Sequence, residues 1–286
     1  MSAPSVQTTP SPDRPVADGE TRASGKQSRA LVNNYFIRQA SVVAAFIIIW
    51  GLWVEIRDVN PLLVPSPLAV ASAFAELSAS GALLSYVSVT MRLLLTGIGI
   101  GVALAFVFTG LAIFFPAVRT VLVTLAAMFN PLPSVALLPL ALLWFGIGSS
   151  PIVFVVAYSV IWAMALSLNS GFETVPLQLR WVGLNLGLSP LQNIVRVYIP
   201  ATIPSLLTGF RLSWAYGWRT VIAAELVFGA MGGSGGIGWM IVVERYNLKP
   251  DRVFVGLITI IAIGLLVEAV FNAIENRTIR RWGMAN

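Results

Sequence analysis

Long apolar stretches separated by short polar segments dominate the chain from residue 41 onward. Residues 93–118 and 120–172 contain no charged side chain, and further apolar stretches begin near residues 41, 205 and 253. A helix of about 20 apolar residues spans a bilayer, whereas membrane strands are short and alternate in polarity. The pattern therefore predicts an all-α polytopic membrane protein with about six transmembrane helices.

One predicted span is interrupted by prolines. Asn130-Pro131-Leu132-Pro133 falls inside an uncharged stretch, and a broken membrane helix is tolerated where it faces protein or a water-filled cavity. The break is therefore a candidate for the lining of a transport pathway. A short amphipathic helix outside the lipid is expected over Leu68–Leu77. The six predicted spans are Ser41–Val54, Leu93–Val118, Thr120–Trp144, Ile152–Leu168, Ser205–Ala230 and Val253–Ala273.

Polar segments divide the chain and orient it. Residues 1–38 have no apolar periodicity and are expected to be a disordered cytoplasmic tail, followed by a transmembrane domain over 39–276 and a cytoplasmic tail over 277–286. The first tail carries Arg and Lys and the second carries three Arg, which favours a cytoplasmic location for both. Six spans also place both termini on one side. The polar segment 173–204 then also faces the cytoplasm.

Composition excludes several functions. The chain is 57% hydrophobic and 10% charged, with no Cys and no His, so disulfides, thiol nucleophiles and imidazole chemistry are excluded. We expect no catalytic residue and no metal site. The net charge of +6 comes from Lys and Arg near the span ends, which indicates topology rather than nucleic-acid binding. The Gly-rich run Gly232–Gly238 lacks the lysine of a phosphate-binding loop and is interpreted as a flexible outer loop.

The cytoplasmic segment predicts two short helices joined by a turn. Gly187 can end the first helix, Ser189 can cap the second, and Pro190 suits its first position. Such an element can dock a soluble partner, although an ordinary structured loop is an equal alternative on this pattern alone.

The same segment resembles the EAA loop of binding-protein-dependent ABC importer permeases. The resemblance lies in Gly187, nine further residues, and then Val197-Tyr198-Ile199-Pro200. The E-A-A positions of that loop are occupied here by Trp181, Val182 and Gly183, so the contact made by the family's Glu has no equivalent. Other stretches are similar to the nitrate, sulfonate and taurine branch of these permeases: Leu63–Pro67, Pro131–Gly148, Leu207–Arg211 and Gly217–Glu225.

The resemblance implies a fold and a set of partners. The fold would be that of a type I ABC importer permease in the bacterial inner membrane. The chain would pair with a second copy, two cytoplasmic ATP-binding subunits and an extracytoplasmic solute-binding protein. ATP and Mg would bind in the ATPase partner, and this chain would bind no cofactor and be no enzyme. Residues implied to couple to the ATPase are Leu184, Gly187, Leu188, Ser189, Pro190, Asn193, Arg196, Ile199 and Pro200.

Charges within the spans are candidates for the pathway, because ionisable groups in a membrane are costly. Arg219 lies deep in the fifth span, and two copies of it would suit an anion. Glu225 is six residues further on and is not expected to pair with Arg219 within one helix. Arg211 is expected to snorkel, and Glu268 to satisfy a helix partner. The candidate pathway residues are Arg92, Asn130, Trp144, Trp218, Arg219 and Glu225.

Together these features predict the permease subunit of an ATP-driven importer for a small anion such as nitrate, a sulfonate, taurine or an aromatic acid. Two transport alternatives stay open: an importer of a heterocyclic vitamin precursor, and an ion-coupled secondary carrier. An intramembrane enzyme is disfavoured, because the spans contain few polar groups able to act in catalysis.

Overall fold

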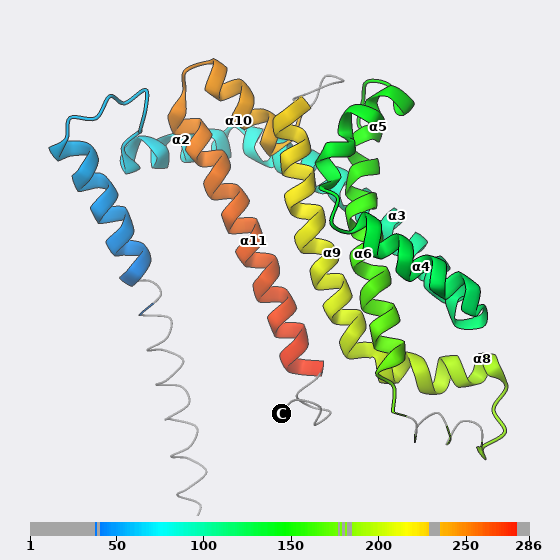
Figure 1. Ribbon diagram of the computed structural model, residues 1–286. Helices are drawn as coiled ribbons and strands as arrows, with labels where there is room; N and C mark the ends of the chain where they lie inside the picture. The colour runs from blue at the N-terminus through cyan, green and yellow to red at the C-terminus, as the bar shows by residue number, and fades with distance from the viewer. Residues whose placement is uncertain are drawn as a thin grey trace, which may run out of the picture. The chain divides into compact units, whose positions relative to one another are not determined.

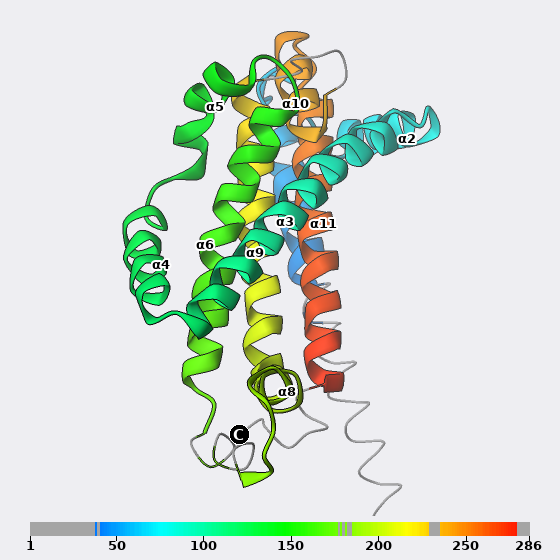
Figure 2. The ribbon, with the colours of Figure 1, turned by 90° about the vertical axis from the view of Figure 1, so that its right-hand side faces the viewer.

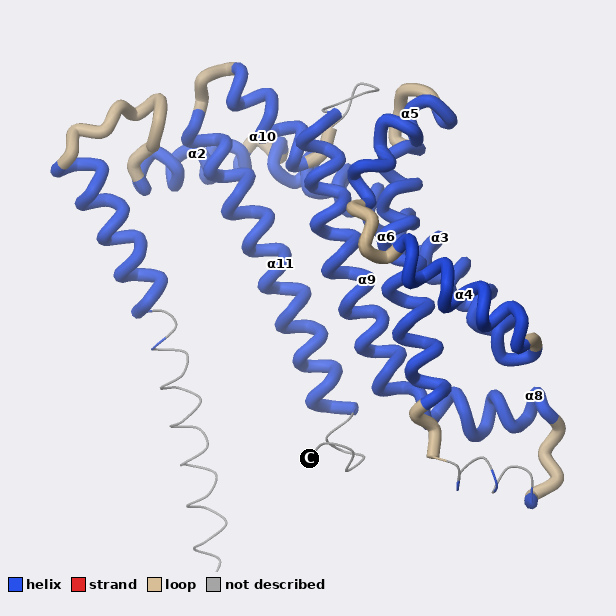
Figure 3. The backbone as a smooth tube through the Cα atoms, viewed as in Figure 1, coloured by secondary structure: helices blue, strands red, loops and turns tan. Residues whose placement is uncertain are grey.

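The computed structural model describes residues 38, 41–176, 178, 181, 185–228 and 235–278, and these form helices and loops without a strand (Figure 3). The predicted all-α class is confirmed. The chain divides into two units, Met1–Asp58 and Val59–Asn286. The first contains the helix Ser41–Ile56, whose apolar side chains are exposed, and is described by itself. Most of the predicted tail, residues 1–37, lies outside the described residues.

The second unit is a bundle of helices (Figure 1). We name its two ends by the elements they carry: the α10 end, where α2 also lies, and the α8 end. Its elements are α2 (Pro67–Ala79), α3 (Ala82–Phe114), α4 (Pro116–Phe129), η1 (Ser134–Leu137), α5 (Leu138–Phe145), α6 (Ser150–Glu173), α8 (Pro190–Asn193), η2 (Ile194–Tyr198), α9 (Ile199–Phe228), α10 (Ile237–Tyr246) and α11 (Pro250–Thr278).

Three described helices, α3, α6 and α11, are long and apolar enough to cross a membrane. The bent pair α4 and η1–α5 makes a fourth if it counts as one span. The helix α9 has 30 residues, which is long enough, but it is not among the helices that meet both criteria. The helix Ser41–Ile56 is apolar but short. The predicted count of about six spans is therefore not confirmed by length and hydropathy.

The proline break predicted near Asn130 is a sharp bend. The helix axes on its two sides differ in direction by 92°. Pro131 and Pro133 have no N–H groups with which to continue the helical hydrogen bonds of α4. Helix α4 therefore ends at Phe129, and a 3₁₀ turn from Ser134 starts the next segment.

The core lies around α6, which packs against α3 and α9 (Figure 2). Its Val155, Val156 and Val160 are fully buried. Helix α3 presents glycines to α6, and a Cβ at Gly101 would lie 2.7 Å from the carbonyl oxygen of Ala157. Small residues allow such close approach between membrane helices.

Candidate functional site

The turn before α8 has the backbone geometry expected of a helix stop. Gly187 has a φ of +62°, in the left-handed region, and no atom of the described residues lies within 4 Å of where its Cβ would be. Glycine is the residue that adopts this conformation at little cost. Leu184, also predicted for this segment, lies outside the described residues.

Two reciprocal hydrogen bonds cap α8. The Gln192 backbone N–H donates to Ser189 Oγ over 3.3 Å, and the Ser189 N–H donates to Gln192 Oε1 over 3.1 Å. This is a capping box, in which two donors at a helix start are satisfied together. Sequence reasoning identified Ser189 and Pro190 but missed Gln192, although the spacing Ser-x-x-Gln signals it.

The π-helical turn η2 joins α8 to α9. Pro200 has no N–H to donate one turn back, which explains why the helix is irregular just before it. In Figure 2, α8 is seen end-on while α9 runs along the bundle, so α8 crosses the end of the bundle. Leu186 is 69% exposed and Val195 is 55% exposed. The segment 185–199 therefore presents apolar side chains at the α8 end, with the exposed Arg196 among them.

The predicted pathway residues do not form one cluster. Trp218 is buried and stacks on Trp214, with ring centroids 5.9 Å apart. Trp144 is exposed and meets Phe154 edge-on. Arg92 is exposed on α3. These three side chains therefore lie in separate environments.

Arg219 lies on an exposed stripe of α9. Thr208, Leu212, Tyr216 and Leu226 share this stripe, following the helical period. Within the described chain Arg219 has no ion pair. Exposing a guanidinium to lipid along a membrane helix costs free energy. This stripe is therefore better suited to face water or another subunit.

Arg211, in contrast, is neutralised within the chain. It forms ion pairs with Glu268 and with Glu275 of α11, the latter over 3.2 Å. Sequence reasoning expected Arg211 to snorkel and did not anticipate that two carboxylates on the neighbouring helix lie within reach. The prediction that Glu268 satisfies a helix partner is confirmed.

Asn130 lines a cavity of about 200 Å³. The break after α4, helix α6 and helix α9 form its walls. Tyr216, from the same stripe as Arg219, also lines it. Asn130 at the proline break thus lines this cavity, whereas Trp144 is not among the described lining residues; the role of both in a transport pathway stays a prediction.

Glu225 is the centre of a buried polar cluster at the α10 end. Its side chain is 1% exposed, and Thr90 of α3 donates from Oγ1 to it over 3.0 Å. The Gly238 N–H donates to Glu225 Oε2, and the Ile237 N–H donates to Thr90 Oγ1, both over 2.9 Å. Glu225 and Thr90 therefore hold the first backbone N–H groups of α10. Sequence reasoning missed Thr90.

This cluster also corrects the interpretation of the Gly-rich loop. Residues 232–234 of the predicted loop lie outside the described residues, whereas Gly235 to Gly238 are buried and α10 begins at Ile237. A Cβ at Gly236 would lie 2.1 Å from both Glu225 Oε1 and Thr90 Oγ1. Glycine is required here because the backbone packs directly on the carboxylate.

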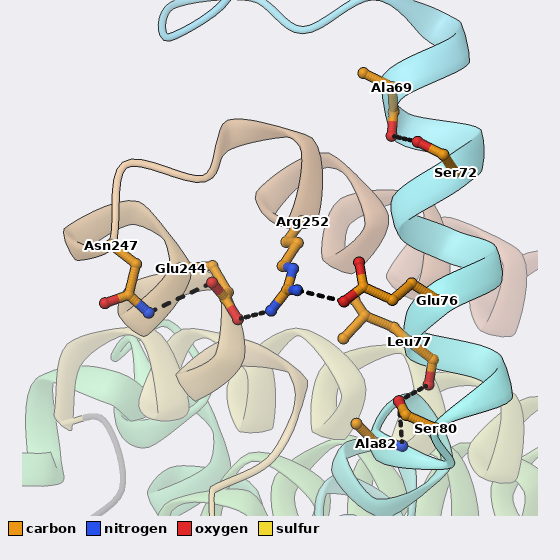
Figure 4. Close-up of polar contacts among 9 residues, drawn as sticks. All are labelled: Ala69, Ser72, Glu76, Leu77, Ser80, Ala82, Glu244, Asn247 and Arg252. Carbon is orange, nitrogen blue, oxygen red and sulfur yellow. Dashed lines mark hydrogen bonds and ion pairs between the residues drawn. The ribbon is translucent and has the colours of Figure 1, made fainter.

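The other end of α10 is held by charged side chains (Figure 4). Arg252 of α11 lies between Glu244 and Glu76 of α2, at 3.2 Å and 2.8 Å. The Asn247 amide donates to Glu244 over 3.4 Å. Polar contacts thus hold α10 at both of its ends. At ten residues this helix is too short to cross a bilayer.

Several known proteins are similar to this chain in sequence or in fold. The chain is 28% identical to a putative aliphatic sulfonates transport permease of Bacillus subtilis, over 83% of this chain and 84% of the relative. It is 28% identical to the taurine transport system permease of Escherichia coli, over 82% and 86%. A crystal structure of an amino acid ABC transporter matches with a TM-score of 0.55 at 17% identity, over 72% of this chain and 97% of that one, which shows the fold alone.

A family model covers most of the bundle. It matches residues 97–280, from the glycines of α3 to the end of α11. The match includes the capped turn, α8 and α9, and the buried cluster around Glu225 apart from Thr90. The chain therefore belongs to the family of binding-protein-dependent transport system inner membrane components, and is a membrane permease subunit.

Proposed function

We propose that this permease forms the pathway of an ATP-driven importer for a small anion, and that residues 185–200 couple it to an ATPase subunit. The observation that supports the coupling role is the geometry of this segment. It is a short capped helix that crosses the α8 end, is continuous with α9 and exposes Leu186 and Val195. A force on such an element reaches α9 directly, because no loop intervenes.

The partners follow from the family and from the exposed α9 stripe. We infer a homodimer, two cytoplasmic ATPase subunits and an external binding protein. A second copy would place the Arg219 stripes of two α9 helices around one water-filled pathway. This arrangement removes the cost of exposing Arg219 to lipid.

An anion is favoured as the substrate by two observations. Relatives of the chain are named for aliphatic sulfonates and for taurine, and both kinds of compound carry an anionic sulfonate group. Arg219 is a cation without an ion-pair partner among the described residues, and two copies would focus positive potential in the pathway. Uptake of a neutral heterocycle is the alternative that would not require this cation.

Replacing Arg219 with Gln tests the anion pathway. We expect ATP-driven uptake in proteoliposomes to fall at least tenfold for the variant, because the cation is lost while the side chain keeps much of its length. Arg219→Lys keeps the charge and should retain more uptake. ATPase activity without substrate should be nearly unchanged in both variants. Uptake that is independent of ATP would instead indicate an ion-coupled carrier.

Cysteine labelling tests the proposed orientation, with both termini and the α8 end in the cytoplasm. The chain contains no Cys, so single cysteines can be introduced cleanly. Ser78 on α2 and Ser189 before α8 are both exposed. In intact cells a membrane-impermeant maleimide should label Ser78→Cys but not Ser189→Cys. Labelling of Ser189→Cys alone would reverse the orientation.

A further inference from the structure

We propose that the cavity at the proline break is a substrate-binding site, present once in each copy, and that it selects a flat organic anion without an ammonium group. This inference rests on the proposed importer function. It adds the position of the site and the shape and charge of the substrate.

The cavity is built where three parts of the bundle meet. The break between α4 and η1 is drawn as a loop beside α6 in Figure 3. Asn130 contributes from this break, Tyr158 and Trp162 from α6, and Tyr216 from α9. One copy supplies all of these groups, so the site does not depend on how two copies assemble.

Two exposed polar side-chain groups of the lining are free to bind a ligand, and the Trp162 indole N–H also has no hydrogen-bond partner among the described residues but is fully buried. Among the described residues, neither the Asn130 side-chain amide nor the Tyr216 hydroxyl has a hydrogen-bond partner. Other lining groups are already engaged: Ser134 and Thr220 bond each other over 2.8 Å, and the Tyr158 hydroxyl donates to the Phe129 carbonyl oxygen over 2.8 Å.

The charge balance of the cavity favours an anion. The described residues of the lining include no acidic side chain, whereas the free amide N–H and hydroxyl groups can donate to an oxyanion. Arg219 lies three residues from Tyr216, so it is next to the cavity on the same stripe of α9. A zwitterion such as taurine would bring an ammonium group that finds no carboxylate here.

Aromatic side chains and size indicate the rest of the substrate. Phe129 stacks on Trp162 with ring centroids 5.6 Å apart, and Tyr158 meets Trp162 edge-on at 6.1 Å. A cavity of about 150 Å³ suffices to hold benzene, and this one has about 200 Å³. An aryl carboxylate or aryl sulfonate would place its ring against this wall and its oxygens near Asn130 and Tyr216. Nitrate would leave the aromatic wall uncovered.

The test measures binding to the permease in nanodiscs, without the binding protein that would otherwise select the ligand. Radiolabelled benzoate is the probe, with empty nanodiscs as the blank. Wild-type permease should bind benzoate saturably, benzenesulfonate should compete, and equal concentrations of nitrate or taurine should not. Asn130→Leu and Tyr216→Phe should each weaken binding at least fivefold. The control Tyr246→Phe, at an exposed tyrosine of α10, should bind as the wild type does.

Each other outcome overturns the proposal. No saturable benzoate binding, equal competition by taurine or nitrate, or unchanged binding in a variant that removes both free groups would do so. The melting temperatures of the variants should match that of the wild type, because both side chains are exposed. If Asn130→Leu misfolds, Asn130→Ser takes its place in the test. Failure of the importer function itself looks different: the complete complex would then show no ATP-driven uptake, whatever the permease binds.

Discussion

Replacing residues 185–193 with a flexible Gly/Ser linker is expected to abolish ATP-driven uptake and to release the ATPase subunit from the permease. The replacement removes the Gly187 turn, the capping box of Ser189 and Gln192, and the exposed Leu186. The bundle should still fold, because among the described elements α8 makes extensive contact only with the π-helical turn that follows it. Co-purification of the ATPase subunit and uptake in proteoliposomes are the measurements.

Point variants distinguish the contribution of this segment's shape to coupling from the contribution of its charge. Gly187→Val forces a β-branched residue into a left-handed backbone, at a cost of about 1–2 kcal/mol or more. Gly81→Val is the matched control, since Gly81 has a φ of +73° and also faces open space, but lies at the other end of the bundle, before α3. Only Gly187→Val should weaken ATPase association and coupling.

Arg196→Ala should have a milder effect than Gly187→Val, because an exposed ion pair contributes only about 0–1 kcal/mol. Normal association and uptake in the linker variant would refute the coupling role of this segment. Equal losses in Gly81→Val and Gly187→Val would assign the effect to general destabilisation.

The second large effect is expected at Glu225. Glu225→Leu should lower the melting temperature and reduce uptake to background, because the Thr90 hydroxyl and the Gly238 N–H would lose their acceptor in a buried site. An unsatisfied buried polar group costs about 1–3 kcal/mol, and here two are created together. The first turn of α10 would then be held only by its packing. Thermal melting in detergent and uptake in proteoliposomes measure the two effects.

Two further variants and one control test whether this effect arises in the cluster itself. Glu225→Gln keeps one oxygen for Gly238 and should be intermediate. Gly236→Ala introduces a Cβ that would lie 2.1 Å from Glu225 Oε1 and should resemble Glu225→Leu, whereas Gly99→Ala on α3 meets open space and should be silent. ATPase association should persist in all four variants, because the cluster lies at the end opposite α8. Wild-type uptake by Glu225→Leu would show that the cluster has no role.

Local chemistry determined much of this protein from sequence alone. Long apolar stretches predicted the membrane helices α3, α6 and α11, because a lipid-exposed backbone must satisfy its own hydrogen bonds. Gly187, Ser189 and Pro190 predicted the turn before α8, since capping depends on residues within a few positions of each other. Pro131 and Pro133 predicted the break after α4 for the same reason.

Only the tertiary structure decided which distant groups meet. Thr90 and Glu225 are 135 residues apart, and nothing in either local sequence indicates that one carboxylate would hold the start of α10. Arg211 and Arg219 look alike along α9, yet only Arg211 faces carboxylates on α11. The bend of 92° and the cavity beside it depend equally on how α6 and α9 pack against the break. Helical periodicity gives the faces of a helix, but the partner of each face is set by the long-range packing of the bundle.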